Sequence, residues 1–296
     1  MPDVELLLDA RATLAESLLW DPEEVVLFWA DIRAPALFRL DPASLEQRRW
    51  NLPADVGAFA LADDRRTAVV ALRTGLFALS LATGALEQLE SPPFDPARFR
   101  FNEGACDAVG RFWVGSMFDP LPGENGHEPE PGPLVSWCPV SGLLPQPDAA
   151  RCHNGMGWSP DGDTFYLSHS QERVVFAFPF DARSGQLGER RVFVRPNGGG
   201  VPDGAAVDEE GAYWCAMHGG GCLHRYAPDG ALLQEVALPV SQPTMCAFGG
   251  PDMRTLFVSS ASEHLSPEQK QAEPLAGGLF RFEPGVRGLP KPYLVR

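Results

Sequence analysis

The chain has 296 residues, a hydrophobic fraction of 44% and a formal net charge of −15 at pH 7. The apolar content is that of a globular protein and is too high for a disordered one. The negative charge argues against nucleic acid and anionic membranes as partners, because both require a basic face on the protein. We therefore expect a small-molecule ligand or a metal ion, with no nucleic-acid partner and no membrane partner.

The N-terminus and the cysteines indicate a cytoplasmic protein. Residues 1–5 lack the basic stretch and long apolar core of a signal peptide, and no apolar run approaches the ~20 residues of a membrane span. The six cysteines form no Cys-x-x-Cys pair and no dense framework, which favours reduced thiols. We expect a monomer or a weak homo-oligomer.

An internal repeat organises the chain from one end to the other. Each repeat has a short apolar strand, a turn rich in Asp and Gly, a strongly apolar second strand, and then a third and a more polar fourth strand. The turns with their second strands span residues 20–29, 63–70, 107–114, 159–167, 208–214 and 249–258. Four antiparallel strands that recur every ~40–50 residues are typical of propeller blades. The sequence predicts an all-β fold, a six-bladed β-propeller that forms a single domain over residues 1–296.

Two details of this architecture stay open. Residues 4–8 could add the outer strand of the last blade, but residues 293–295 compete for that place. Residues 120–133, rich in Pro, Gly and Glu, are expected to form a long loop within blade three, and such loops often cover sites.

Each first strand carries one residue at the same register, five positions before its turn. The innermost strands of a propeller line its central channel, and side chains alternate along a strand, so this position should form a ring around the axis. The six ring members are Glu16, Ala58, Asn102, Asn154, Asp203 and Thr244. Five of them carry an oxygen atom in the side chain, and two of these side chains are carboxylates.

Carboxylates and amides that converge in a channel are costly unless a positive charge lies among them. A hard divalent cation would satisfy them, since calcium and magnesium prefer oxygen ligands. The alternative is a wet channel whose polar residues bind only water. The register thus predicts one divalent cation; calcium, zinc, magnesium, manganese and iron are all candidates.

Blade three places a cationic side chain beside the ring. Arg100 lies two residues before Asn102, so both side chains point the same way, and Glu103 follows directly. A guanidinium donates several hydrogen bonds in fixed directions, which suits an oxygen-rich ligand. The alternative for Arg100 is an ordinary salt bridge at the rim.

Two other motifs are not expected to carry chemistry. Residues 218–221, His-Gly-Gly-Gly, resemble the oxyanion loop of α/β-hydrolases, but the sequence has no Gly-x-Ser-x-Gly elbow, so a glycine turn is expected. His153 precedes Asn154 on a strand and therefore faces the opposite way, which favours packing over metal ligation.

Over nearly its whole length the chain resembles the regucalcin/gluconolactonase (sugar lactonase) family. The segments that carry the resemblance are residues 15–20, 100–104, 154–159, 202–204 and 247–252. The resemblance implies a six-bladed propeller with one divalent cation held by a Glu, an Asn and an Asp, here Glu16, Asn154 and Asp203. It also implies that Arg100 and Asn102 contact the substrate.

The chain departs from the family pattern in two places. The family commonly has Asn-Asp-Gly where residues 102–104 read Asn-Glu-Gly. Regucalcin places a substrate-contacting Glu shortly after Gly-Thr-Met, where this chain has Gly-Ser-Met at residues 115–117 and Asp119 as the nearest carboxylate. We therefore expect a sugar preference that differs within the family.

These residues predict metal-assisted hydrolysis of an aldonolactone, such as gluconolactone or a pentonolactone, to the aldonic acid. A bound cation supplies Lewis-acid polarisation of the lactone carbonyl. Asp203 is the predicted general base for the attacking water, and Arg100, Asn102 and Glu103 are predicted to orient the sugar hydroxyls. Two alternatives stay open: a phosphotriesterase-type hydrolase on the same scaffold, and a calcium-binding propeller without catalysis.

Overall fold

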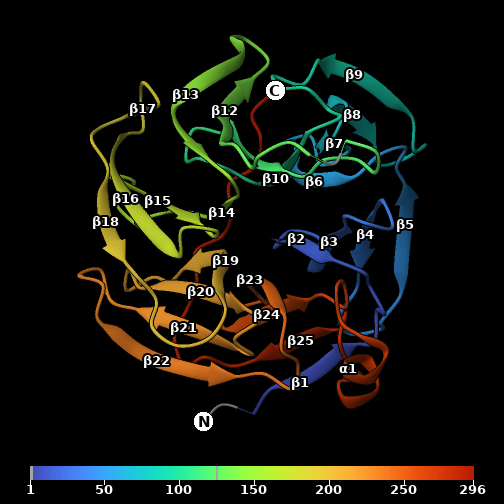
Figure 1. Cartoon of the computed structure of the whole chain (residues 1–296), viewed down its shortest axis with the longest axis vertical. Coiled ribbons are helices and arrows are strands. Elements are labelled where there is room, and N and C mark those ends of the chain that lie inside the picture. Colours follow the sequence, from blue (N-terminus) through green and yellow to red (C-terminus); the bar gives the residue numbers. More distant parts are fainter. Residues whose placement is uncertain (1–2, 125) are drawn as a thin grey trace.

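The computed structural model of the protein describes residues 3–124 and 126–296. Six antiparallel sheets are arranged as blades around a central axis (Figure 1). The predicted six-bladed β-propeller is therefore confirmed, with four strands in each blade except blade four, whose outer edge is split into two short strands. The described residues contain one helix, α1 (Pro267–Ala272), and none long and apolar enough to cross a membrane.

The strands follow the chain from the innermost to the outermost position of each blade. Blades one to three are β2 (Ala15–Asp21), β3 (Val26–Asp31), β4 (Ala36–Leu40), β5 (Gln47–Asn51); β6 (Val56–Leu61), β7 (Thr67–Leu72), β8 (Gly75–Ser80), β9 (Leu86–Glu90); and β10 (Phe99–Cys106), β11 (Phe112–Phe118), β12 (Gly132–Cys138), β13 (Gly142–Ala150). Blades four to six are β14 (His153–Trp158), β15 (Thr164–His169), β16 (Val174–Asp181), β17 (Gln186–Leu187), β18 (Arg191–Val194); β19 (Val201–Val207), β20 (Tyr213–His218), β21 (Cys222–Tyr226), β22 (Leu232–Ala237); and β23 (Pro243–Gly249), β24 (Thr255–Ser260), β25 (Leu279–Phe282), β1 (Glu5–Leu8).

The N-terminal strand closes the ring of blades. β1 pairs antiparallel with β25, with Glu5 opposite Arg281, and so forms the outer strand of blade six. Of the two segments that competed for this place in the sequence, residues 4–8 therefore occupy it. Blade six joins strands from both ends of the chain, which holds the propeller closed.

Buried tryptophans and aspartates repeat from blade to blade. The indole Nε1 of Trp113 donates to Asp107 at 2.9 Å, and that of Trp214 donates to Asp208, also at 2.9 Å. Each aspartate stands in the turn before the strand that carries its tryptophan, so the Asp-rich turns both reverse the chain and satisfy a buried donor. The inner strands β2, β6 and β23 are buried on both faces, whereas outer strands such as β5 are largely exposed.

The six inner strands form a closed ring around the channel. Each lies against the next in the order β2, β6, β10, β14, β19, β23 and back to β2. The C-terminal segment 286–296 then crosses the central region of the propeller (Figure 1). It bonds to the far end of one inner strand and to the turn after another: Leu294 N–H donates to Leu61 O at 2.8 Å, and Glu209 N–H donates to Arg287 O at 2.9 Å. This tail therefore covers the end of the channel opposite the predicted ring.

Candidate metal centre and active site

The polar ring residues lie near the starts of four inner strands, where the strand pairing is irregular. The register of each of these strands against the second strand of its blade shifts at one place. The shift follows Glu16 in β2, Phe101 in β10, Asn154 in β14 and Pro202 in β19. A bulge of this kind re-aims side chains and leaves backbone groups unpaired. Ser17, directly after Glu16, has φ of 56°, a left-handed conformation that is rare for a residue with a side chain. Such strain is held only where the surroundings enforce it, and it clusters at functional sites.

A chain of hydrogen bonds fixes the amides of the ring. Arg100 Nη1 donates to Asn102 Oδ1 at 2.6 Å, and Asn102 Nδ2 donates to Asn154 Oδ1 at 2.7 Å. Asn154 Nδ2 donates to Ser170 Oγ at 2.9 Å, and that hydroxyl donates to Pro202 O at 2.6 Å. The chain links blades three, four and five at the level of the ring, and it assigns which atom of each amide is the oxygen.

The other two ring members contribute no free oxygen. Ala58 is fully buried and apolar. The hydroxyl of Thr244 donates to Ala15 O and lies 2.8 Å from Ser259 Oγ, so it braces the strand that carries Glu16. The candidate donor set is therefore Glu16, Asn154 and Asp203, with Asn102 beside them.

The two carboxylates of this set lie in an unfavourable environment for charge. Burial, together with the charge of Glu103, raises the pKa of Glu16 to about 8. Burial and the charges of Glu16 and Glu103 hold the pKa of Asp203 well above its usual range. Like charges that meet in a buried space raise one another's pKa in this way, and such shifts cluster at functional sites.

Glu103 holds the backbone next to the ring. Its two oxygens accept the N–H groups of Gly155 and Met156, each at 2.7 Å. These are the groups that the register shift after Asn154 leaves without a partner in β15. Burial nevertheless raises the pKa of Glu103 to about 7. Both its oxygens are thus engaged with the backbone that follows Asn154.

Arg100 is also held tightly. Only 2% of the residue is exposed, and its Nε donates to Asp119 Oδ2 at 3.0 Å. The same oxygen accepts Arg33 Nη1 at 2.9 Å and Arg73 Nη2 at 2.7 Å. Although burial acts in the opposite direction, the hydrogen bond from Arg33 and the charges of the three arginines lower the pKa of Asp119 to about 2. Asp119 therefore anchors Arg100.

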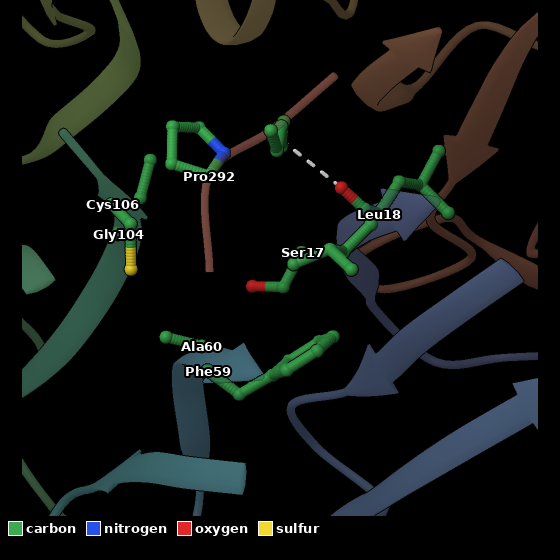
Figure 2. Close-up of a pocket in the computed structure, with 10 residues that line it drawn as sticks. Ser17, Leu18, Phe59, Ala60, Gly104, Cys106 and Pro292 are labelled. Carbon is green, nitrogen blue, oxygen red and sulfur yellow. Dashed lines mark hydrogen bonds between the residues drawn. The ribbon is translucent and has the colours of Figure 1, made fainter. Parts of the chain in front are cut away.

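Sequence reasoning missed one cationic group of the channel, Lys291 of the tail. Its Nζ donates to Leu18 O at 3.1 Å, marked by the dashed line in Figure 2. Its charge acts on both Glu103 and Glu16 and opposes the rise of their pKa values. No periodic pattern in the sequence points to residue 291. The one feature that sets it apart is that lysine is rare: Lys270 and Lys291 are the two lysines among the 24 lysine and arginine residues.

A second group of candidate ligands lies behind Asn154. Asp148 Oδ2 is 2.7 Å from His169 Nε2 and 3.2 Å from His153 Nε2, and Asp148 Oδ1 accepts Arg190 Nη1 at 2.6 Å. The three ligand atoms are close enough to hold a metal ion. The arginine and the two imidazoles already satisfy the carboxylate, however, so the group is better described as a buried polar network that braces β14. His153 is fully buried, in keeping with the packing role expected for it.

The channel carboxylates fit a divalent cation by charge and by donor type. Glu16, Glu103 and Asp203 are all buried, and Lys291 brings one positive charge to them, while Arg100 is already paired with Asp119. When all three carboxylates are ionised, one ammonium leaves two negative charges without compensation, and a divalent cation would neutralise these and favour the ionised form. Carboxylate and amide oxygens are ligands that calcium and magnesium prefer.

Comparisons with known proteins identify the family of this chain. A family described as SMP-30/Gluconolactonase/LRE-like region matches residues 14–262. The 6-deoxy-6-sulfogluconolactonase of Pseudomonas putida is 37% identical over 284 residues, which cover 95% of this chain and 94% of that protein. The L-arabinolactonase of Azospirillum brasilense is 34% identical over 282 residues, with 93% and 90% covered. The crystal structure of a calcium-binding protein, regucalcin, from Agrobacterium tumefaciens superposes with a TM-score of 0.89 at 30% identity, covering 99% of this chain and 97% of that one. The chain belongs to the SMP-30/gluconolactonase/LRE-like family.

Proposed function

We propose that the protein hydrolyses the ester bond of a sugar lactone with the help of one divalent cation held by Glu16, Asn154 and Asp203. The observation that carries the proposal is the meeting of the carboxylates of Glu16 and Asp203 in a buried space, where burial first and the charge of Glu103 second raise the pKa of Glu16 to about 8. Relatives named as lactonases support the reaction, and a relative described as calcium-binding supports the cation. The substrate class we infer is an aldonolactone, and the product is the aldonic acid.

Each residue of the site has a distinct part in this proposal. A bound cation supplies electrostatic polarisation of the lactone carbonyl. Asp203 takes the proton of the attacking water, because a carboxylate whose pKa is held above its usual range is a stronger base. Arg100 fixes the amide of Asn102 through a hydrogen bond, and Asn102 orients the sugar hydroxyls beside the ligand Asn154. Glu103 holds the backbone that carries Asn154.

Two other functions on the same site are tested together with this one. A phosphotriesterase-type hydrolase would use the same cation, and a calcium-binding propeller would bind the cation without turnover.

The six cysteines are free thiols in the structure, which supports our expectation of a cytoplasmic location.

The decisive experiment begins with metal analysis of the purified protein and removal of the metal by a chelator. The metal-free protein is then loaded in turn with calcium, zinc, magnesium, manganese and iron(II), and assayed on gluconolactone, pentonolactones and an organophosphate triester. We expect lactone hydrolysis that is lost with the metal and restored by at least one cation. Hydrolysis of the triester alone would assign the phosphotriesterase function, and stoichiometric calcium binding without turnover of any lactone would assign the binding protein.

A further inference from the structure

The C-terminal tail brings a lysine ammonium into the channel from the end opposite the ring. Lys291 stands between Pro290 and Pro292, whose rings restrict the backbone on both sides. The tail is anchored close by: Leu294 N–H donates to Leu61 O at 2.8 Å, and Tyr293 Oη donates to Asp21 Oδ1, also at 2.8 Å. The lysine is therefore held at a defined position.

The surroundings of this ammonium are mostly apolar. It borders a small cavity of about 10 Å³ whose lining includes Leu18, Phe59 and Cys106. Figure 2 shows Ser17 and Leu18 on one side of this cavity and Gly104 and Cys106 on the other. Its hydrogen-bond partner is the Leu18 carbonyl, so the lysine acts on the carboxylates through space and not as the partner of an ion pair. Charges in apolar surroundings interact over longer distances than they do in water.

The carboxylates that respond to Lys291 are those of the proposed cation site and its support. Burial lowers the pKa of Lys291, and the nearby acidic groups oppose this, with Glu103 first, followed by Cys246 and Glu16. Glu16 is a proposed ligand, and Glu103 holds the two residues after Asn154 through the hydrogen bonds described above. A bound cation and Lys291 would therefore share the same negative charges.

We propose that Lys291 is a built-in cation of the metal centre, a positioning residue that weakens and thereby tunes the binding of the divalent cation. This inference rests on the proposed cation site. Without the bound ion, Lys291 compensates part of the channel charge and limits repulsion among the carboxylates. With the ion present, the two positive charges repel, so the affinity is lower than the three carboxylates alone would produce.

The first test measures calcium affinity by titration calorimetry at about pH 7.5, because burial lowers the pKa of Lys291 and the test needs its charged form. Low ionic strength is used because charge interactions are then least screened. Lys291→Met removes the charge and keeps an unbranched apolar side chain. We expect it to bind calcium about tenfold more tightly, whereas Lys291→Arg, which restores the charge, should bind as the unchanged protein does. Lys270→Met, on the exposed helix α1, is the matched control and should have no effect. Equal or weaker calcium binding by a folded Lys291→Met protein would overturn the inference.

The second test needs no substitution in the measured sample. Because the chain has two lysines, protein labelled with ¹³C at the lysine ε-carbon gives two side-chain NMR signals, and the Lys291→Met protein assigns them. Calcium should shift the Lys291 signal and leave that of Lys270 in place. If calcium binds but the Lys291 signal does not move, the inference about the lysine is wrong and the proposed site stands. If neither calcium nor any other divalent cation binds, the proposed site itself fails, and the inference fails with it.

Discussion

Two groups of buried acids in this propeller differ in how their charge is balanced. Near the start of the inner strands, Asp119 accepts hydrogen bonds from three arginines, and its pKa is lowered to about 2. In the channel, burial and the charge of Glu103 raise the pKa of Glu16 to about 8, and that of Asp203 is raised as well. The first group is paired by the protein itself. The second is compensated only in part.

This difference distinguishes an acid that stabilises the fold from acids that we propose bind a ligand. The arginines around Asp119 are matched by carboxylates: Arg73 also pairs with Asp55 at 2.9 Å, and Arg33 with Glu263 at 2.7 Å. A network satisfied in this way needs no ligand and can hold Arg100 rigidly. The channel carboxylates raise the free energy of the metal-free fold, because charge is buried there without a full set of partners. That cost is the physical ground for proposing a bound cation in the channel and none beside Asp119.

The largest effect is expected from Asp203→Asn. Since an amide does not accept the proton of the attacking water, lactone hydrolysis should fall by about 10²–10⁴-fold even when metal occupancy is restored. Turnover is to be compared at equal, measured metal content. Asn154→Ala is the control, because it removes a neutral ligand, and excess metal should recover much of its activity. Near-normal turnover by the Asp203→Asn enzyme would leave Asp203 as a ligand only and assign the base to another group.

The same isosteric change should have opposite consequences for stability in the two groups. Asp119→Asn removes the negative charge that three guanidinium groups share. It should lower the free energy of unfolding by about 3 kcal/mol, as for other buried ion pairs that lose one partner. Asp203→Asn, measured on metal-free protein, should leave that free energy unchanged or raise it. Urea unfolding in the presence of a chelator measures both. Similar losses in the two variants would contradict the distinction between the groups.

The pH dependence of the metal-free protein follows from the raised pKa values. Folding raises the pKa of Glu16 from 4.5 to about 8 and that of Glu103 from 4.5 to about 7, so the folded state holds protons that the unfolded state has lost. Stability is therefore fully present below about pH 4.5 for these groups. As the pH rises from about 4.5 towards 7 and then 8, stability should fall progressively, because the unfolded state loses protons that the folded state still holds. Thermal unfolding between these pH values, with chelator, should show the loss. Saturating metal should reduce it, and a flat profile without metal would contradict the assignment.

The smallest effect is expected from Arg100→Ala. Loss of the guanidinium frees Asn102, so the lactone KM should rise about tenfold, the cost of about one charged hydrogen bond. Metal content should change little, because Asn154 keeps its bond to Ser170. Metal analysis and steady-state kinetics on the same sample separate the two. Parallel loss of metal and activity would instead make Arg100 part of the structure of the metal site.

Glu103 has backbone partners that its own segment of sequence does not reveal. It follows Asn102 directly, and its place in a segment shared with the family suggested contact with the substrate. Neighbours on a strand face opposite ways, however, and here the opposite face looks onto the unpaired N–H groups of Gly155 and Met156. Those groups are unpaired because of an irregularity in blade four, which the sequence of blade three alone does not reveal.

The sequence by itself determined the features that repeat. Strand alternation, turn residues and a common register predicted the six blades and the ring that includes Glu16, Asn154 and Asp203, because each depends on local periodicity within one blade. Tertiary structure alone decided the features that do not repeat: the three arginines around Asp119 and the lysine beneath the ring. Lys291 donates to a carbonyl 273 residues away, and Arg33 reaches Asp119 across 86 residues. Such contacts leave no periodic trace in the chain, since they arise only when distant loops and the tail meet around a common axis.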